Sequence, residues 1–292
     1  MFFVFAVIST IAYALHSVWM ASYYRRVDQM VVVTVRGFGL SLALLPGLLV
    51  PGLAGLAKVP DQGRWIVAAS GCALIGNWAG ASSVRHLPIG IAAALNMSLS
   101  TIVSALLSTW LFSERLSPAQ WLWIGLILTS VFALGATRSP PSSLRAHSAP
   151  KGLFFAVVFG LSLGVAFTLI SGVSRALHPL AAGFCWEFTI ATMGAIVVLM
   201  RRLVFKSRAG GLTRRDFGWI ALYGIPGAVG TACYALAVAG GPVAVVATVL
   251  STMMVATSVF AWLIHGERLH AAQWLLVGFI CCALMGMRLS GG

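Results

Sequence analysis

Charged side chains are scarce in this sequence, and acidic ones are the scarcest. Charged residues make up 9% of the 292 residues, and only 6 residues are Asp or Glu. A soluble domain carries about a quarter charged residues, so this chain cannot cover itself with a hydrated surface. Because 60% of the residues are apolar, the composition predicts a polytopic membrane protein.

The sequence also lacks the motifs of enzymes and of metal or cofactor sites. Its 5 cysteines all lie in apolar stretches, without metal-site spacing or a disulfide framework. A Walker-type phosphate loop is missing, and so is a paired His motif. We therefore expect no metal and no cofactor, and a membrane-embedded transferase or protease is disfavoured.

The excess of basic residues has a topological interpretation. A formal net charge of +13 would favour nucleic acid as the partner of a soluble protein. Here the basic residues fall between apolar runs, where they set the orientation of a membrane protein. The expected partners are the lipid bilayer and a small-molecule substrate, and nucleic-acid binding is not expected.

Ten apolar stretches are long enough to cross a bilayer, which takes about 20 residues. They are continuous, as helices are, rather than alternating. They lie at 2–23, 29–50, 64–85, 88–112, 117–137, 152–174, 179–200, 216–238, 242–264 and 270–289. The first has no basic residue before it and Arg25 and Arg26 after it, the reverse of a secretory signal. We expect it to be retained as a span.

One decapeptide occurs twice. "FSERLSPAQW" (112–121) returns as "HGERLHAAQW" (265–274), each time between the fourth and fifth span of a half. A Pro/Ser-rich linker at 138–151 separates five spans at 1–137 from five at 152–292. An odd number of spans per half inverts the second copy. The sequence thus predicts an all-α membrane protein of ten transmembrane helices, built as two inverted five-helix repeats around a central cavity.

Loop charges predict the orientation. Loops on the side of both termini hold five Lys or Arg residues, and the other side holds thirteen. The positive-inside rule places the richer side in the cytoplasm, so both termini are expected to be periplasmic in a bacterial inner membrane. With both halves in one chain, a monomer is sufficient.

The end of each half resembles a known repeat. The stretches "LFSERLSPAQWLWIGLILTSVFALG" and "LIHGERLHAAQWLLVGFICCALMG" are similar to the EamA-type repeat of the drug/metabolite transporter superfamily. Arg36 and Tyr234 stand where such repeats often carry these residues. The sequence departs from the pattern in lacking a proline in "MSLSTIV" and "VLSTMMV", and in the termini, which family members more often hold in the cytoplasm.

The resemblance implies a secondary transporter that works by alternating access. The size of the chain and its aromatic-rich spans are most similar to aromatic-amino-acid exporters, which implies export of hydrophobic amino acids or similar metabolites. A transporter or flippase for drugs, nucleotide sugars or lipid-linked substrates stays open as the alternative.

Two charges lie well inside the predicted spans, Arg36 and Glu187. Burying such a charge costs about 3 kcal/mol on insertion scales, and an intramembrane charge is a candidate functional residue. Arg36 could bind the carboxylate of a zwitterionic substrate and Glu187 its ammonium group, but we do not expect one substrate to use both at once, because the two charges lie nearer to opposite faces. Glu187 could instead carry a coupling proton, because burial disfavours a charged carboxyl group. The alternative is pairing that only holds the bundle together.

Further polar and aromatic residues gather at mid-depth, where they suit a ligand with an apolar body and a few polar groups. These substrate-site candidates are Tyr13, His16, Asn77, Trp78, Asn96, Trp186, Tyr234 and Ser251. Interhelical hydrogen bonding is the alternative interpretation. The pairs Glu114/Arg115 and Glu267/Arg268 are interpreted either as gates, one on each face, or as plain helix caps.

Overall fold

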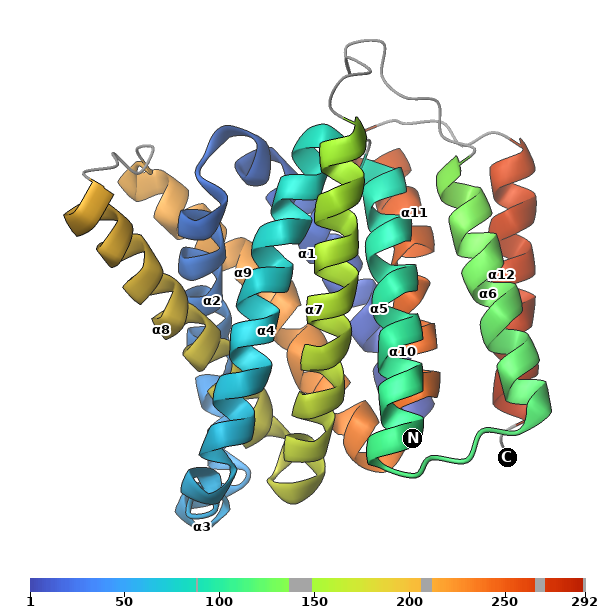
Figure 1. Ribbon diagram of the computed structural model, residues 1–292, viewed down its shortest axis with the longest axis horizontal. Coiled ribbons are helices and arrows are strands. Elements are labelled where there is room, and N and C mark those ends of the chain that lie inside the picture. The colour runs from blue at the N-terminus through green and yellow to red at the C-terminus, as the bar shows by residue number, and fades with distance from the viewer. Residues whose placement is uncertain (88, 137–148, 206–211, 266–270, 291–292) are drawn as a thin grey trace.

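The protein is a bundle of long helices that stand side by side, seen in a computed structural model (Figure 1). The residues that the structure describes are 1–87, 89–136, 149–205, 212–265 and 271–290. No strand occurs among them. The predicted all-α class is therefore confirmed.

Ten helical segments follow one another in two sets of five. The first set is α1 (Phe2–Arg26), α2 (Gln29–Leu44), α4 (Val59–His86), α5 (Ile89–Leu111) and α6 (Pro118–Ala136), with a short 3-10 helix η1 (Leu45–Leu49) and helix α3 (Gly52–Leu56) after α2. The second set is α7 (Ala149–Ala176), α8 (Pro179–Phe205), α9 (Arg214–Gly240), α10 (Val243–Ser251) joined to α11 (Met253–His265), and α12 (Ala271–Leu289). Each predicted span corresponds to one of these segments.

Five of the segments are long and apolar enough to cross a membrane by length and composition alone. They are Phe2–Arg26, Gln29–Leu49, Pro150–Ala176, Pro179–Val204 and Arg214–Gly240. Helix α4 is not among them, because Gly and Ser residues and Asn77 lower its mean hydropathy. It also starts five residues before the predicted span, since Pro60 is tolerated in a first helical turn.

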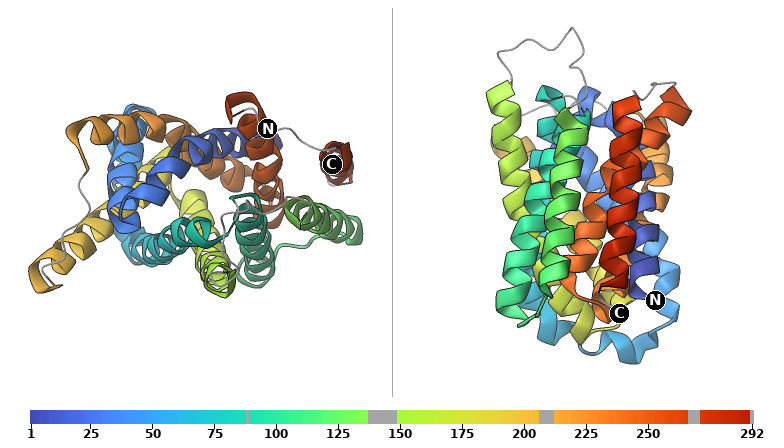
Figure 2. Two further views of the ribbon diagram at one scale, coloured as in Figure 1. Left: turned by 90° about the horizontal axis from the view of Figure 1, so that it is seen from above. Right: turned by 90° about the vertical axis from the view of Figure 1, so that its right-hand side faces the viewer.

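The second set of helices is inverted relative to the first. α1 and α12 bring the two termini to one face of the bundle, whereas α7 begins at the opposite face (Figures 1 and 2). The packing repeats when the sets are exchanged: α4 packs on α7 as α9 packs on α1, and α5 packs on α7 as α10 and α11 pack on α1. Exchanging the sets also turns the α2–α8 contact into itself, and it does the same for the α6–α12 contact. The predicted inverted repeats are confirmed.

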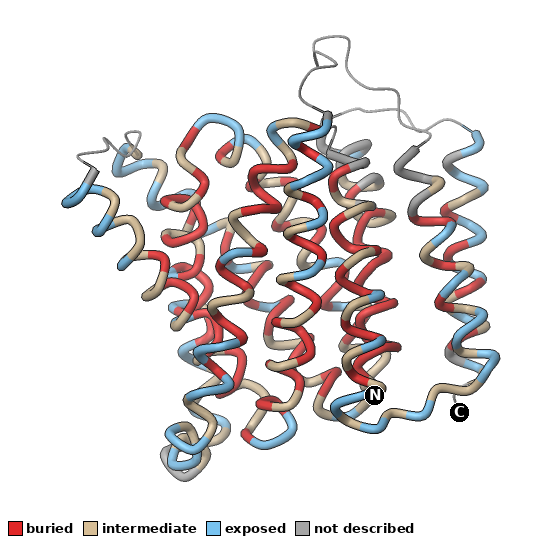
Figure 3. The backbone as a smooth tube through the Cα atoms, viewed as in Figure 1, coloured by how far each residue is buried: buried red, intermediate tan, exposed pale blue. Residues whose placement is uncertain are grey.

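Burial is concentrated in the middle of this arrangement. All nine residues of α10 and ten of the 16 residues of α2 are buried, whereas the α6–α12 pair at one end has few buried residues (Figure 3). Large apolar side chains on that pair, such as Leu122 and Leu275, are exposed at 61% and 77%. In a bilayer, lipid covers such faces.

Glycines set the closest contact between α5 and α7. A Cβ atom on Gly164 would lie 2.6 Å from Cβ of Val103 and 2.8 Å from the carbonyl oxygen of Ser100. Gly160, four residues earlier, has the same tight relation to Leu99. The "GLSLG" stretch therefore serves helix packing, as small residues at this spacing do in membrane helices.

The ninth segment is broken at its middle without a proline. α10 ends at Ser251 and α11 begins at Met253, and the Thr252 amide donates to the Val249 carbonyl at 3.1 Å, a tighter turn than that of an α-helix. The hydroxyls of Ser251 and Thr252 donate to the backbone oxygens of Thr248 and Val249. Such hydroxyl-to-backbone bonds accompany bends in helices, and here they lie at the break itself.

The described ion pairs share one design. Asp28 pairs with Arg201, Asp216 with Arg26 and Glu114 with Arg175, and each pair joins one half to the other. Each acid also accepts hydrogen bonds at the start of a helix: Asp28 at α2, Asp216 at α9 and Glu114 at α10. Half of the six acids therefore cap a helix and join the two halves at once.

Candidate functional site

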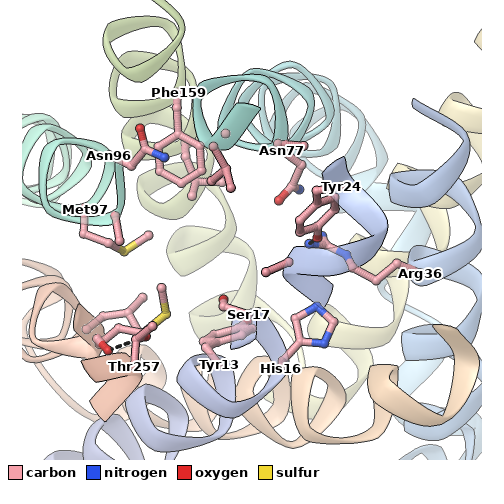
Figure 4. Close-up of a pocket in the computed structure, with 18 of the residues that line it drawn as sticks. Tyr13, His16, Ser17, Tyr24, Arg36, Asn77, Asn96, Met97, Phe159 and Thr257 are labelled. Carbon is pink, nitrogen blue, oxygen red and sulfur yellow. Dashed lines mark hydrogen bonds between the residues drawn. The ribbon is translucent and has the colours of Figure 1, made fainter. Parts of the chain in front are cut away.

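A cavity of about 160 Å³ lies between the two halves. Its described lining comes from α1, α2, α4 and α5 of the first half and from α7, α8, α10 and α11 of the second. Seven of the ten predicted site residues line it: Tyr13, His16, Arg36, Asn77, Asn96, Trp186 and Glu187. Figure 4 shows Arg36, Tyr24 and Asn77 on one side of the cavity and Asn96 and Met97 on another.

Arg36 enters the cavity from α2. Only one of its guanidinium N–H groups has a partner among the described residues: Nη1 donates to the Tyr24 hydroxyl at 3.2 Å. Nε is buried without a partner. Arginine carries five such donors, so four of the five have no partner among the described residues.

Glu187 lines the same cavity from α8 and is 3% exposed. Its Oε1 accepts from the Thr231 hydroxyl at 2.8 Å, and Oε2 has no partner among the described residues. Because the Thr231 hydrogen is used in this bond, the neighbouring Tyr13 hydroxyl must donate to Thr231, at 2.8 Å. A hydrogen-bonded chain thus runs from the cavity wall at Tyr13 to the carboxylate.

A close helix crossing brings Arg36 and Glu187 to one cavity. A Cβ atom on Gly37 would lie 3.0 Å from that of Ala191, so α2 and α8 approach closely beside the two charges. Even so, Arg36 and Glu187 form no ion pair in the described structure, where the ion pairs are those of Arg26, Arg175 and Arg201. The two charges face one cavity without neutralising each other by contact.

His16 is held by one ring nitrogen. Nδ1 lies 2.6 Å from the Tyr223 carbonyl oxygen, which can only accept, so Nδ1 carries the hydrogen. Nε2 has no partner among the described residues. Gly227 makes room for the ring, since a Cβ there would lie 3.2 Å from it. The ring is thus both a link between α1 and α9 and a part of the cavity wall.

Asn96 and Trp186 complete the set of lining residues with an unsatisfied polar atom. Asn96 donates from Nδ2 to the Ser83 hydroxyl at 3.1 Å, and its Oδ1 has no described partner. The same holds for Nε1 of Trp186. Buried polar atoms are almost always hydrogen-bonded in folded proteins. Five of the seven described residues with an unsatisfied buried side-chain atom, all except Ser98 and Ser174, line this one cavity.

Three predicted residues lie outside the cavity lining. Trp78 packs edge-on against Phe155 of α7, with ring centroids 5.5 Å apart. Tyr234 lies behind the wall, where its hydroxyl donates to the Phe167 carbonyl at 3.1 Å and its ring contacts Phe167. Ser251 is fully buried and donates to its own helix. Their contacts are those of helix packing.

Other lining residues were not predicted. They include Ser17, Tyr24, Phe159, Met97, Met253 and Thr257. Tyr24 lies in the last turn of α1, just before Arg25 and Arg26, and an aromatic residue at such a place is typical of a membrane interface. Thr231 does not line the cavity but donates to Glu187. A single hydroxyl in an apolar helix does not reveal from the sequence which residue it will bond.

The cavity extends from mid-depth toward the face opposite the termini. Tyr24 near the end of α1, Val84 near the end of α4 and Ala93 near the start of α5 all line it. On the terminal face, Glu114 accepts from Arg175 at 2.6 Å and from the Val243 amide at 3.0 Å. Arg175 also donates to the Gly241 carbonyl at 2.9 Å. This network joins α7 to the start of α10 and to the segment that follows α5.

The first copy of the repeated decapeptide joins the two halves of the bundle. Glu114 is a cap and also an ion-pair partner across the halves, so the cap and gate interpretations are compatible there. Glu267 and Arg268 lie outside the described residues, and the gate predicted for the second face stays a prediction.

Comparisons with known proteins agree with this architecture. The model of the EamA-like transporter family matches residues 1–136 and 150–289. A solved structure, described only as the crystal structure of a protein, superposes with a TM-score of 0.75 over 97% of this chain and 95% of its own. Its sequence is 16% identical, so the likeness concerns the fold alone. Among curated proteins, none matches the chain.

Replacing Glu114 with Gln should lower the stability of the bundle. The change removes a charge that holds both Arg175 and the start of α10, and hydrogen bonds to charged groups are worth about 1.5–3 kcal/mol. We expect a loss of roughly 1–2 kcal/mol, because the Arg175 side chain is 30% exposed. Thermal unfolding of the purified protein in detergent measures it.

The matched control is Arg115→Gln, which removes a neighbouring exposed charge for which the structure describes no ion pair. It should unfold at the wild-type temperature. Equal unfolding temperatures of Glu114→Gln and wild type would contradict the role given to this network.

Proposed function

Because the chain belongs to the EamA-like transporter family, we propose that it is a secondary transporter that exports amino acids by alternating access. Its substrates are amino acids with aromatic or other hydrophobic side chains, or small metabolites of similar shape. The membrane is the inner membrane of a bacterium, and one chain suffices for transport because it contains both halves.

The observation that carries this proposal is the unpaired Arg36 and Glu187 in one cavity. Both line it, and neither is in an ion pair among the described residues. A charge held inside a membrane protein without a partner costs about 3 kcal/mol on insertion scales. A zwitterion compensates both charges at once, with its carboxylate at Arg36 and its ammonium group at Glu187.

The rest of the wall suits an apolar side chain. Met97, Phe159 and Met253 line the cavity together with Leu163 and Leu250. Methionine is flexible and polarisable, and it adapts to aromatic and aliphatic partners alike. This composition supports hydrophobic side chains of several shapes over small polar ones.

The size of the cavity supports a small substrate over the larger alternatives. An apolar cavity of about 150 Å³ holds a benzene molecule, and the cavity here measures about 160 Å³. It therefore suits one aromatic side chain, whereas a nucleotide sugar or a lipid-linked substrate is several times larger. Drugs with a single ring are small enough for a cavity of this volume.

The loop charges and the shape of the cavity support loading from the cytoplasm, as export requires. The basic residues concentrate on the face opposite the termini, which the positive-inside rule assigns to the cytoplasm. The cavity reaches toward that face, and the Glu114–Arg175 network joins the two halves at the other. This arrangement suits a state that loads substrate from the cytoplasm.

Counterflow in proteoliposomes tests the function. Vesicles preloaded with unlabelled Phe should accumulate labelled Phe, and Arg36→Gln should lower the initial rate roughly 10- to 100-fold, because a hydrogen-bonded charge contributes about 1.5–3 kcal/mol. Arg202→Gln, which removes an exposed charge at the far end of α8, should leave the rate unchanged.

Two results would count against the proposal. One is the absence of counterflow for Phe, Trp, Met and Leu with folded wild-type protein. The other is a folded Arg36→Gln protein that accumulates Phe at the wild-type rate.

A reporter fused to the C-terminus tests the orientation. With periplasmic termini, a fused alkaline phosphatase should be active and a fused green fluorescent protein dark, because the first folds only in the periplasm and the second only in the cytoplasm. The opposite pattern would reverse both the orientation and the side from which the cavity is loaded.

A further inference from the structure

Tyr24 lies at the charged end of the cavity, beside Arg36. It belongs to the last turn of α1, lines the cavity and is partly buried. Figure 4 shows its ring between Asn77 and Arg36. Its hydroxyl oxygen accepts from Nη1 of Arg36 at 3.2 Å, the one hydrogen bond described for either side chain.

This hydrogen bond fixes the role of the hydroxyl group. A guanidinium group only donates, so the Tyr24 oxygen must accept, and the Tyr24 hydrogen points away from Arg36. Among the described residues no acceptor takes that hydrogen. Arg36 and Tyr24 therefore present donors side by side: the remaining N–H groups of the guanidinium and the O–H of the phenol.

A separate contact holds the backbone at Tyr24. Arg85, at the end of α4, donates from Nε to the Tyr24 carbonyl oxygen at 3.0 Å and from Nη2 to the Val27 carbonyl oxygen. These bonds fix the end of α1, where backbone oxygens otherwise lack partners. The phenol is thus attached to a backbone whose position α4 determines.

Paired donors with one positive charge match a carboxylate. A carboxylate has two oxygens that accept hydrogen bonds in one plane, and a charge-assisted bond is about twice as strong as a neutral one. Building on the proposed amino-acid transport, we propose that Tyr24 is a substrate-binding residue. It donates its phenolic hydrogen to one oxygen of the substrate carboxylate while Arg36 binds the other.

The test compares ligands that differ only at this group. L-phenylalanine and L-phenylalaninol share the ring and the ammonium group, but phenylalaninol has a neutral hydroxymethyl group instead of the carboxylate. Each is titrated against counterflow of labelled Phe in wild type, Tyr24→Phe and Tyr23→Phe. Tyr23 is the matched control, because it is 5% exposed, packs on Tyr223 and does not line the cavity.

The expected result is selective. Tyr24→Phe should raise the half-inhibitory concentration of phenylalanine about 3- to 10-fold, the effect of one lost hydrogen bond, and leave that of phenylalaninol unchanged. Tyr23→Phe should change neither. Equal weakening of both ligands by Tyr24→Phe would make the residue structural, and no change for phenylalanine would also overturn the proposal.

A second measurement separates this inference from the proposed function. If folded wild-type protein shows no amino-acid counterflow, the proposed function fails. The carboxylate site is then assayed by the rise in unfolding temperature that 3-phenylpropionate causes. A smaller rise in Tyr24→Phe than in wild type would support the site, and an equal rise, or none in wild type, would overturn it.

Discussion

Two opposite charges that share a membrane-embedded cavity without touching each other are the constraint on which the rest of this structure depends. Each costs about 3 kcal/mol to bury on insertion scales, and direct contact would recover part of this cost. Arg36 instead donates to Tyr24, and Glu187 accepts from Thr231. The protein thus keeps a cation and an anion that are not paired with each other. This arrangement suits a carrier of zwitterions, whereas a purely structural role would favour a direct ion pair.

The inverted repeat explains how the charges come to share a cavity. Arg36 lies on α2 and Glu187 on α8, the equivalent helices of the two halves, which pack directly on each other. Every described ion pair joins the two halves at a membrane face, and each of its acids also caps a helix. Charge is therefore used in two ways: at the faces to hold the halves together, and at mid-depth unpaired.

The sequence was sufficient for the fold, and seven of its ten candidate site residues line the cavity, which has 23 described lining residues. Span length and the repeated decapeptide predicted ten inverted helices, and intramembrane charge singled out Arg36 and Glu187. Thr231 and Tyr24 were not predicted. A hydroxyl in an apolar helix, or a tyrosine near a helix end, gives the same sequence pattern whether the residue binds a ligand or only packs. Trp78 and Ser251 show the converse, as polar residues at mid-depth whose partners are neighbouring helices. The break at Thr252 was not predicted, because no proline marks it in the sequence and it coincides only with local hydroxyl bonds.

Calorimetric titration of the wild-type protein with three ligands tests the central claim most directly. Phenylalanine carries both charges, 2-phenylethylamine only the ammonium group, and 3-phenylpropionate only the carboxylate. If Arg36 and Glu187 both bind the substrate, phenylalanine should bind at least about tenfold more tightly than either relative, because each relative leaves one buried charge without a partner. Equal binding of phenylalanine and either relative would show that one of the two charges has no part in recognition.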